Sequence, residues 1–158
     1  MQRKDKLNYY LDIAQTVSER GTCMFTNSGA IIVKNDSIIA TGYTGSPRGR
    51  KNCIDTNICA CGSSTADNCR SVHAEANCII SAAYSEMIGG TMYLCSVDKA
   101  TGNIKSDEED CCSMCKKLVI NAGIDRVIIR KTPTEYKEII VRDWVFNDDS
   151  LHAGALYK

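Results

Sequence analysis

Residues 72–97 read VHAEANCIISAAYSEMIGGTMYLCSV, and residues 111–130 read CCSMCKKLVINAGIDRVIIR. In each stretch a run with helical spacing of apolar residues stops at glycine, at Gly89 and Gly90 in the first and at Gly123 in the second. A short apolar run typical of a buried strand follows each stop. Two successive helix–strand units predict neighbouring parallel strands with helices packed on the sheet.

The first half of the chain adds a helix and a hairpin. Residues 6–19 place apolar side chains at helical spacing, and residues 30–33 and 37–41 are two β-branched runs joined by a Lys-Asn-Asp turn. The stretch EYKEIIVRDWVF, residues 135–146, predicts a short helix or strand. Together these elements predict a three-layer α/β/α sandwich on a mixed sheet. With 158 residues, 44% of them apolar, we expect one domain, residues 1–158.

The charge balance argues against a nucleic-acid partner. The formal net charge is zero although 24% of the residues are charged, so no overall basic field attracts a phosphate backbone.

The first fifteen residues carry charges where a secretory signal needs an apolar core, and no apolar run reaches the length of a membrane span. We therefore expect a cytoplasmic protein that takes a small substrate and has no membrane partner.

Ten cysteines are the strongest anomaly of composition. In a reducing compartment such a number favours thiolate metal ligands or reactive thiols over a disulfide framework. Cys78 and Cys95 lie inside apolar runs, and we expect them to be ordinary small buried residues.

Two predicted helices begin with residues that bind metals. His73 and Glu75 open one, and Cys112 and Cys115 open the next. Each motif alone is weak, because His-x-Glu is often a solvent-facing pair and Cys-x-x-Cys can be a thioredoxin-like redox pair. Together they offer one imidazole and two thiolates, which leave the fourth position of a zinc ion for water, as in catalytic sites. Glu75 would then shuttle protons without binding the metal.

The combination matches the zinc-deaminase signature, and the resemblance extends further along the chain. Four blocks in this order, residues 29–53, 69–83, 89–94 and 111–129, resemble the cytidine and deoxycytidylate (dCMP) deaminase family. The resemblance covers residues 5–131 as the core and leaves residues 132–158 as a C-terminal tail. It implies a five-stranded, cytidine deaminase-like sheet, hydrolysis of dCMP to dUMP and ammonia, and a homo-oligomer, either dimer or hexamer.

By position, the resemblance implies that His73, Cys112 and Cys115 bind the catalytic Zn²⁺ and that Glu75 is the general acid–base. The backbone carbonyl of Ala74 would accept a hydrogen bond from the substrate amino group. Two residues depart from the family pattern. Thr44 replaces an asparagine that contacts the sugar, and Cys111 replaces a proline. Cys111 is an alternative ligand, although adjacent cysteines fit one tetrahedral ion poorly.

The long polar loop before His73 holds further cysteines. A loop of this length needs a function or a cross-link, and some dCMP deaminases carry a structural zinc in the corresponding place. That resemblance implies a second Zn²⁺ on Cys23, Cys53 and Cys69, with Cys59 or Cys61 as the fourth ligand and Cys59 preferred. A disulfide and free thiols are the alternatives.

Basic residues in the same region suggest how a nucleotide would be held. Arg48, Arg50, Lys51 and Arg70 can pair with a phosphate, or they can form an ordinary solvated loop. The acidic run at residues 106–110 should fold away from the site. Besides a dCMP deaminase, two hypotheses stay open. The first is a deaminase of a free base, nucleoside or tRNA base, which is consistent with Thr44 in place of the sugar-binding asparagine. The second is a catalytically silent zinc scaffold, and the presence of Glu75 argues against it.

Overall fold

One mixed sheet organises the chain, and the computed structural model describes residues 1–59, 69–106, 110–148 and 151. The strand order is β2-β1-β3-β4-β5, in which β3 and β4 are parallel and the other neighbours are antiparallel. The predicted parallel pair and the five-stranded mixed sheet are confirmed. The strands are β1 (Thr26–Lys34), β2 (Ser37–Tyr43), β3 (Thr91–Asp98), β4 (Arg126–Arg130) and β5 (Tyr136–Ile140).

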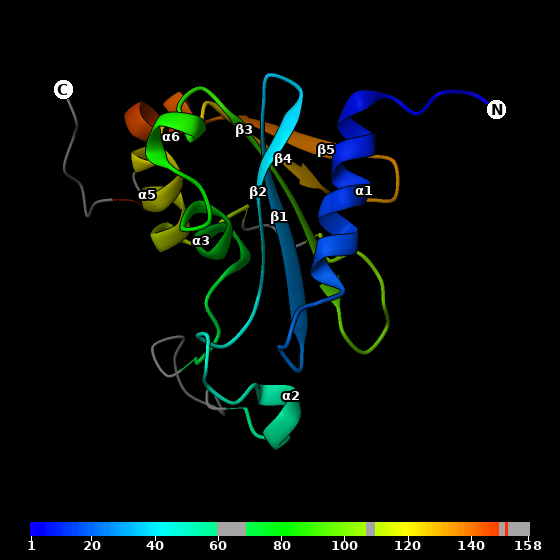
Figure 1. Ribbon diagram of the computed structural model, residues 1–158. Helices are drawn as coiled ribbons and strands as arrows, with labels where there is room; N and C mark the ends of the chain where they lie inside the picture. The colour runs from blue at the N-terminus through cyan, green and yellow to red at the C-terminus, as the bar shows by residue number, and fades with distance from the viewer. Residues whose placement is uncertain (60–68, 107–109, 149–150, 152–158) are drawn as a thin grey trace.

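Helices cover both faces of the sheet. The helices are α1 (Lys6–Ser18), α2 (Cys53–Thr56), α3 (Ala74–Ile79), α4 (Tyr84–Met87), α5 (Ser113–Asn121) and α6 (Val141–Asn147). Figure 1 shows α1 on one side of the sheet and α3, α5 and α6 on the other, so the three-layer sandwich is confirmed. Within the described residues, no helix is long and apolar enough to cross a membrane.

The alternation of side chains along the strands builds a core on each face. Ile31 and Tyr93 pack with Leu11 of α1, whereas Ile32 and Met92 lie in the larger core under α3 and α5. Successive side chains of a strand point to opposite faces of the sheet, so a strand covered on both faces contributes alternate residues to the two cores.

Cys78 and Cys95 are both fully buried, as expected from the sequence. Burial raises the pKa of the Cys78 thiol to about 12 and that of Cys95 to about 11. Both are therefore structural thiols with little reactivity.

The single helix expected over residues 72–87 is wrong in one respect, because the chain breaks between α3 and α4. The hydroxyl of Ser81 donates to the carbonyl of Asn77 at 2.7 Å, a local bond of the kind that competes with helix continuation. The backbone N–H of Ala83 then donates to Glu86 at 3.2 Å and starts α4. The tail, for which the sequence left helix or strand open, is the edge strand β5 followed by α6.

Helix α3 packs with its backbone directly against the sheet. A Cβ atom at Gly42 of β2 would lie 2.2 Å from the amide nitrogen of Cys78 and 2.5 Å from the carbonyl oxygen of Ala74. Only glycine permits this approach. The contact fixes the N-terminal end of α3, where the predicted metal ligands begin.

Candidate metal centre

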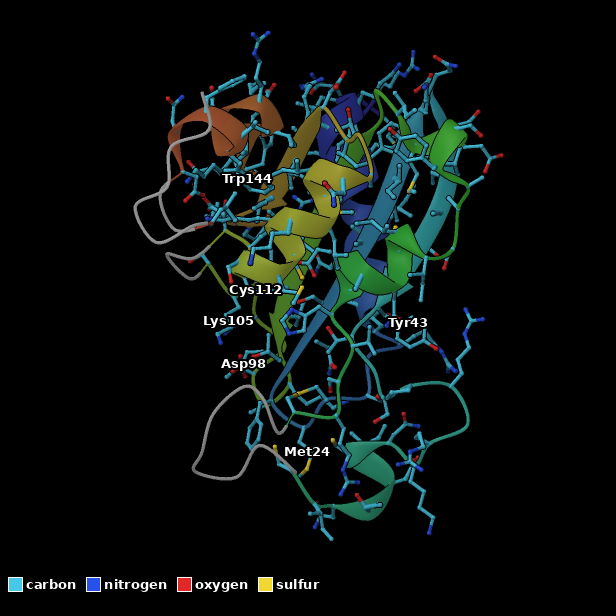
Figure 2. The ribbon with its side chains drawn as sticks, turned by 90° about the vertical axis from the view of Figure 1, so that its left-hand side faces the viewer. Met24, Tyr43, Asp98, Lys105, Cys112 and Trp144 are labelled. Atoms are coloured by element: carbon cyan, nitrogen blue, oxygen red, sulfur yellow. The ribbon has the colours of Figure 1, made fainter. Side chains whose placement is uncertain are left out.

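Two helix N-termini meet at one end of the sheet. His73 is the N-cap of α3, and Cys112 is the N-cap of α5. The segment before His73 is held by a short bridge, in which the N–H of Val72 donates to the carbonyl of Gly45 at 2.7 Å. Figure 2 shows Cys112 at the end of α5 that faces α3. The fold therefore brings together residues that are far apart in the sequence.

His73, Cys112 and Cys115 form a tight group. The Nδ1 atom of His73 lies 3.4 Å from the Sγ of Cys112 and 3.3 Å from the Sγ of Cys115. One ligand atom from each residue can be chosen so that all lie within 4.8 Å of one another. The N–H of Cys115 also donates to the Sγ of Cys112 at 3.4 Å, which orients that thiol. His73 is exposed while Cys115 is buried, so the group is open on one side only.

The chemistry of this donor set fits a zinc ion. Two thiolates and one imidazole are the ligands that zinc prefers, and three protein ligands leave a position open. Burial raises the pKa of the Cys115 thiol, and the negative charge of Glu75 raises it further. Thiolates in this pocket therefore need a compensating positive charge, which a divalent cation supplies when it binds.

Glu75 lies inside the first turn of α3, only 6% exposed. Burial, followed by the charge of Glu75 and a hydrogen bond with its side chain, raises the pKa of Cys111 well above the usual value. The carboxyl group therefore faces the cysteines that start α5. Cys111 itself is not a member of the three-residue group, so the structure does not support it as a competing ligand.

Comparison with known proteins agrees with this geometry. A family model described as "Cytidine and deoxycytidylate deaminase zinc-binding region" matches residues 4–131. The chain belongs to the cytidine and deoxycytidylate deaminase family. It is similar to the deoxycytidylate deaminase of Mycobacterium phage D29, with 31% identity over 139 residues, 83% of this chain and 98% of that protein.

Two further similar proteins differ in how much of their length this chain covers. The deoxycytidylate deaminase of Schizosaccharomyces pombe is 26% identical over 126 residues, which are 77% of this chain but 35% of the relative. Among solved structures, the dCMP deaminase from the cyanophage S-TIM5 in complex with dCMP and dUMP is 25% identical, with a TM-score of 0.58. That match covers 82% of this chain and 84% of the cyanophage chain.

The second zinc site predicted on four cysteines is not supported by the described residues of this deaminase-family chain. Among the described residues, the His73 group is the one set of three or more metal-binding side chains close enough to share an ion. Cys23, Cys53, Cys59 and Cys69 form no such set. The alternative ligand Cys61 lies outside the described residues. The described geometry thus does not support the structural zinc.

Thr44 turns toward the sheet. Its hydroxyl oxygen accepts a hydrogen bond from the N–H of Ser28 at 3.0 Å, and the residue is 8% exposed. A contact of Thr44 with a sugar hydroxyl would have to share this oxygen. The carbonyl of Ala74 lies against Gly42, and its predicted contact with the substrate remains a prediction.

The basic residues divide between two cavities. Arg50, Lys51 and Arg70 line one cavity of about 700 Å³, which we call the basic cavity. Arg48 instead lines a smaller one of about 120 Å³ beside β2 and α3. The bridge between Gly45 and Val72 joins the loop that carries Arg50 to the segment between Arg70 and His73. From the sequence, Arg48 is the first candidate for binding the substrate phosphate. A loop sequence does not show which way each arginine points, so its separation from Arg50 and Arg70 could not be predicted.

Proposed function

We propose that this protein is a zinc-dependent deaminase that converts dCMP and water to dUMP and ammonia. The observation that carries the proposal is the convergence of His73, Cys112 and Cys115 beside the buried Glu75. The dCMP and dUMP bound to the similar cyanophage enzyme support a pyrimidine nucleotide as substrate. A single domain over residues 1–158, a cytoplasmic location and a homo-oligomer are further parts of the proposal. The first two rest on the sequence patterns described above, and the homo-oligomer rests on the family resemblance.

The chain supplies three functions to this reaction. His73, Cys112 and Cys115 would hold a zinc ion, and the ion would supply a water that loses its proton at neutral pH. Glu75 accepts a proton from the attacking water, delivers it to the ring nitrogen, and then assists the departure of ammonia. Because Glu75 is only 6% exposed, bulk water has little access to the carboxyl group that carries this proton. The exposed side of His73 leaves the pyrimidine a route to the metal.

Removal of zinc tests this proposal. We expect the purified protein to release ammonia from dCMP, to lose that activity after treatment with a chelator, and to regain it on addition of Zn²⁺. Metal analysis should find about one zinc per chain on the described ligand set. Two zinc ions per chain would restore the predicted cysteine site. Ammonia release that persists without any bound metal would contradict the proposed function.

Substrate phosphate is expected in the basic cavity. Charge-assisted hydrogen bonds to a phosphate each contribute roughly 1.5–3 kcal/mol. We therefore expect Arg50→Ala and Arg70→Ala each to raise the KM for dCMP about tenfold or more and to leave the KM for deoxycytidine unchanged.

Arg48→Ala is the matched control, because Arg48 lines the other cavity. Steady-state kinetics with dCMP and deoxycytidine decide the matter. An increase in KM that is found only in Arg48→Ala would favour the interpretation from the sequence over the one from the structure.

A second candidate substrate class is an amino-heterocycle without a phosphate, such as a nucleoside or a free base. The bond between Thr44 and Ser28 favours it, since that hydroxyl is already engaged. Equal kcat/KM for dCMP, cytidine and cytosine would support this candidate. A silent zinc scaffold is the least favoured, because a structural metal needs no buried carboxyl group beside it.

A further inference from the structure

Asp110 forms a double ion pair just before helix α5. Its carboxylate oxygens accept hydrogen bonds from Lys131 at 3.3 Å and from Lys137 at 2.5 Å. The side chain of Asp110 is only 16% exposed, whereas those of the lysines are 24% and 51% exposed. A largely covered carboxylate shared by two ammonium groups holds its position better than an isolated surface pair.

The position of this ion pair relates it to the metal centre. Asp110 stands two residues before Cys112, while Lys131 directly follows β4 and Lys137 belongs to β5. The ion pairs therefore tie the start of α5 to the end of β4 and to the edge strand β5. We call these three residues the Asp110 clamp.

The main-chain hydrogen bonds on either side of Asp110 lie some residues away. Among the described residues, the N–H of Lys105 donates to the carbonyl of Ser96, and the N–H of Lys116 donates to the carbonyl of Cys112 in the first turn of α5. Within the part of the chain that the structure describes, Asp110 and Cys111 make no main-chain hydrogen bond. The described contacts of these two residues are made by their side chains, by Asp110 through its ion pairs and by Cys111 through burial and its contact with Glu75.

We propose that Asp110 is a positioning residue, which through Lys131 and Lys137 holds the Cys112 thiol at the distance from His73 that metal binding needs. This inference rests on the proposed function, because it takes Cys112 as a zinc ligand. Residues that orient metal ligands from outside affect metal affinity by about 10-fold to 100-fold. The lysines also offset the charge of Asp110, so the carboxylate repels an anionic substrate less.

Zinc release tests the clamp without any substrate. The zinc-loaded protein is mixed with excess EDTA, and the rate of zinc loss is followed. Asp110→Asn keeps the shape and removes the charge, so we expect zinc loss at least tenfold faster than from the unmodified protein. Asp110→Glu, which keeps the charge, should release zinc within about threefold of the unmodified rate.

Glu138→Gln is the matched control. Glu138 pairs with Arg126 at 2.8 Å across the same two strands, β4 and β5, and this ion pair does not involve α5. We expect this variant to release zinc at the unmodified rate. If Asp110→Asn does not fold, Lys137→Met removes one half of the clamp and should still accelerate release.

Three results would overturn the inference. Unchanged zinc release from Asp110→Asn or Lys137→Met would refute the clamp alone and leave the proposed function intact. If zinc release were accelerated equally in Glu138→Gln, the cause would be a general weakening of the pairing between β4 and β5 and not the loss of the Asp110 clamp. An unmodified protein that never retains zinc would refute the proposed function, and the clamp with it.

Discussion

Glu75→Gln is expected to lower the rate of dCMP deamination by at least about two orders of magnitude, the usual contribution of a general acid–base group. Glutamine has nearly the same shape but can neither accept nor return a proton at neutral pH. Because Glu75 is not a member of the ligand group, the variant should keep its zinc. Ammonia release and metal content, measured on the same preparation, check both statements.

Glu86→Gln serves as the control for this experiment. Glu86 accepts a hydrogen bond from Ala83 at the start of α4, and glutamine can accept the same bond. Its activity should match that of the unmodified protein. Full activity in Glu75→Gln would refute the mechanism, and loss of zinc in that variant would make Glu75 a ligand instead.

Asp12→Ala is expected to lower the free energy of unfolding by about 3 kcal/mol. The guanidinium of Arg130 is wholly buried, and its Nη2 atom lies 2.5 Å from Asp12. Its other acceptors are the neutral oxygens of Asn8 and Pro133, and its Nε atom has no partner among the described residues. Without Asp12 a positive charge stays buried and loses its one carboxylate.

Urea unfolding of Asp12→Ala and Lys4→Met separates this effect from surface electrostatics. Lys4 pairs with the other carboxylate oxygen of Asp12, but more than half of the Lys4 side chain is exposed. Such pairs contribute about 0–1 kcal/mol. Equal losses of stability in the two variants would show that burial of Arg130 is not the cause.

The helix–strand units of the second half could be predicted from the sequence because each element carries a strong local signal. β3 and β4 are buried on both faces and read as apolar runs, and Gly123 ends α5 with a positive φ of 73°. The strand β5 could not be distinguished from a helix, since four of its five side chains are exposed. The segment becomes a strand through its antiparallel hydrogen bonds with β4, which the local sequence pattern does not reveal.

The site residues differ in how far the sequence could predict their positions. His73, Cys112 and Cys115 follow a spacing that leaves little choice of partner, and the structure brings them together. The direction of a single loop side chain has no such signal, so the positions of Thr44, Arg48 and Arg70 needed coordinates. The role of Asp110 was hidden for the same reason, because its partners lie 21 and 27 residues further along the chain.

The ligands of the metal group are separated by 39 and 42 residues in sequence, with the whole of β3 between them. An unfolded chain therefore contains no such site, and an ion that binds the folded form cross-links two distant segments. By mass action, the folded population then grows with the concentration of free metal relative to its dissociation constant. On the proposed function, that metal is zinc, and the amount of folded protein then follows the zinc supply, so that scarcity of the metal lowers the level of the protein as well as its activity.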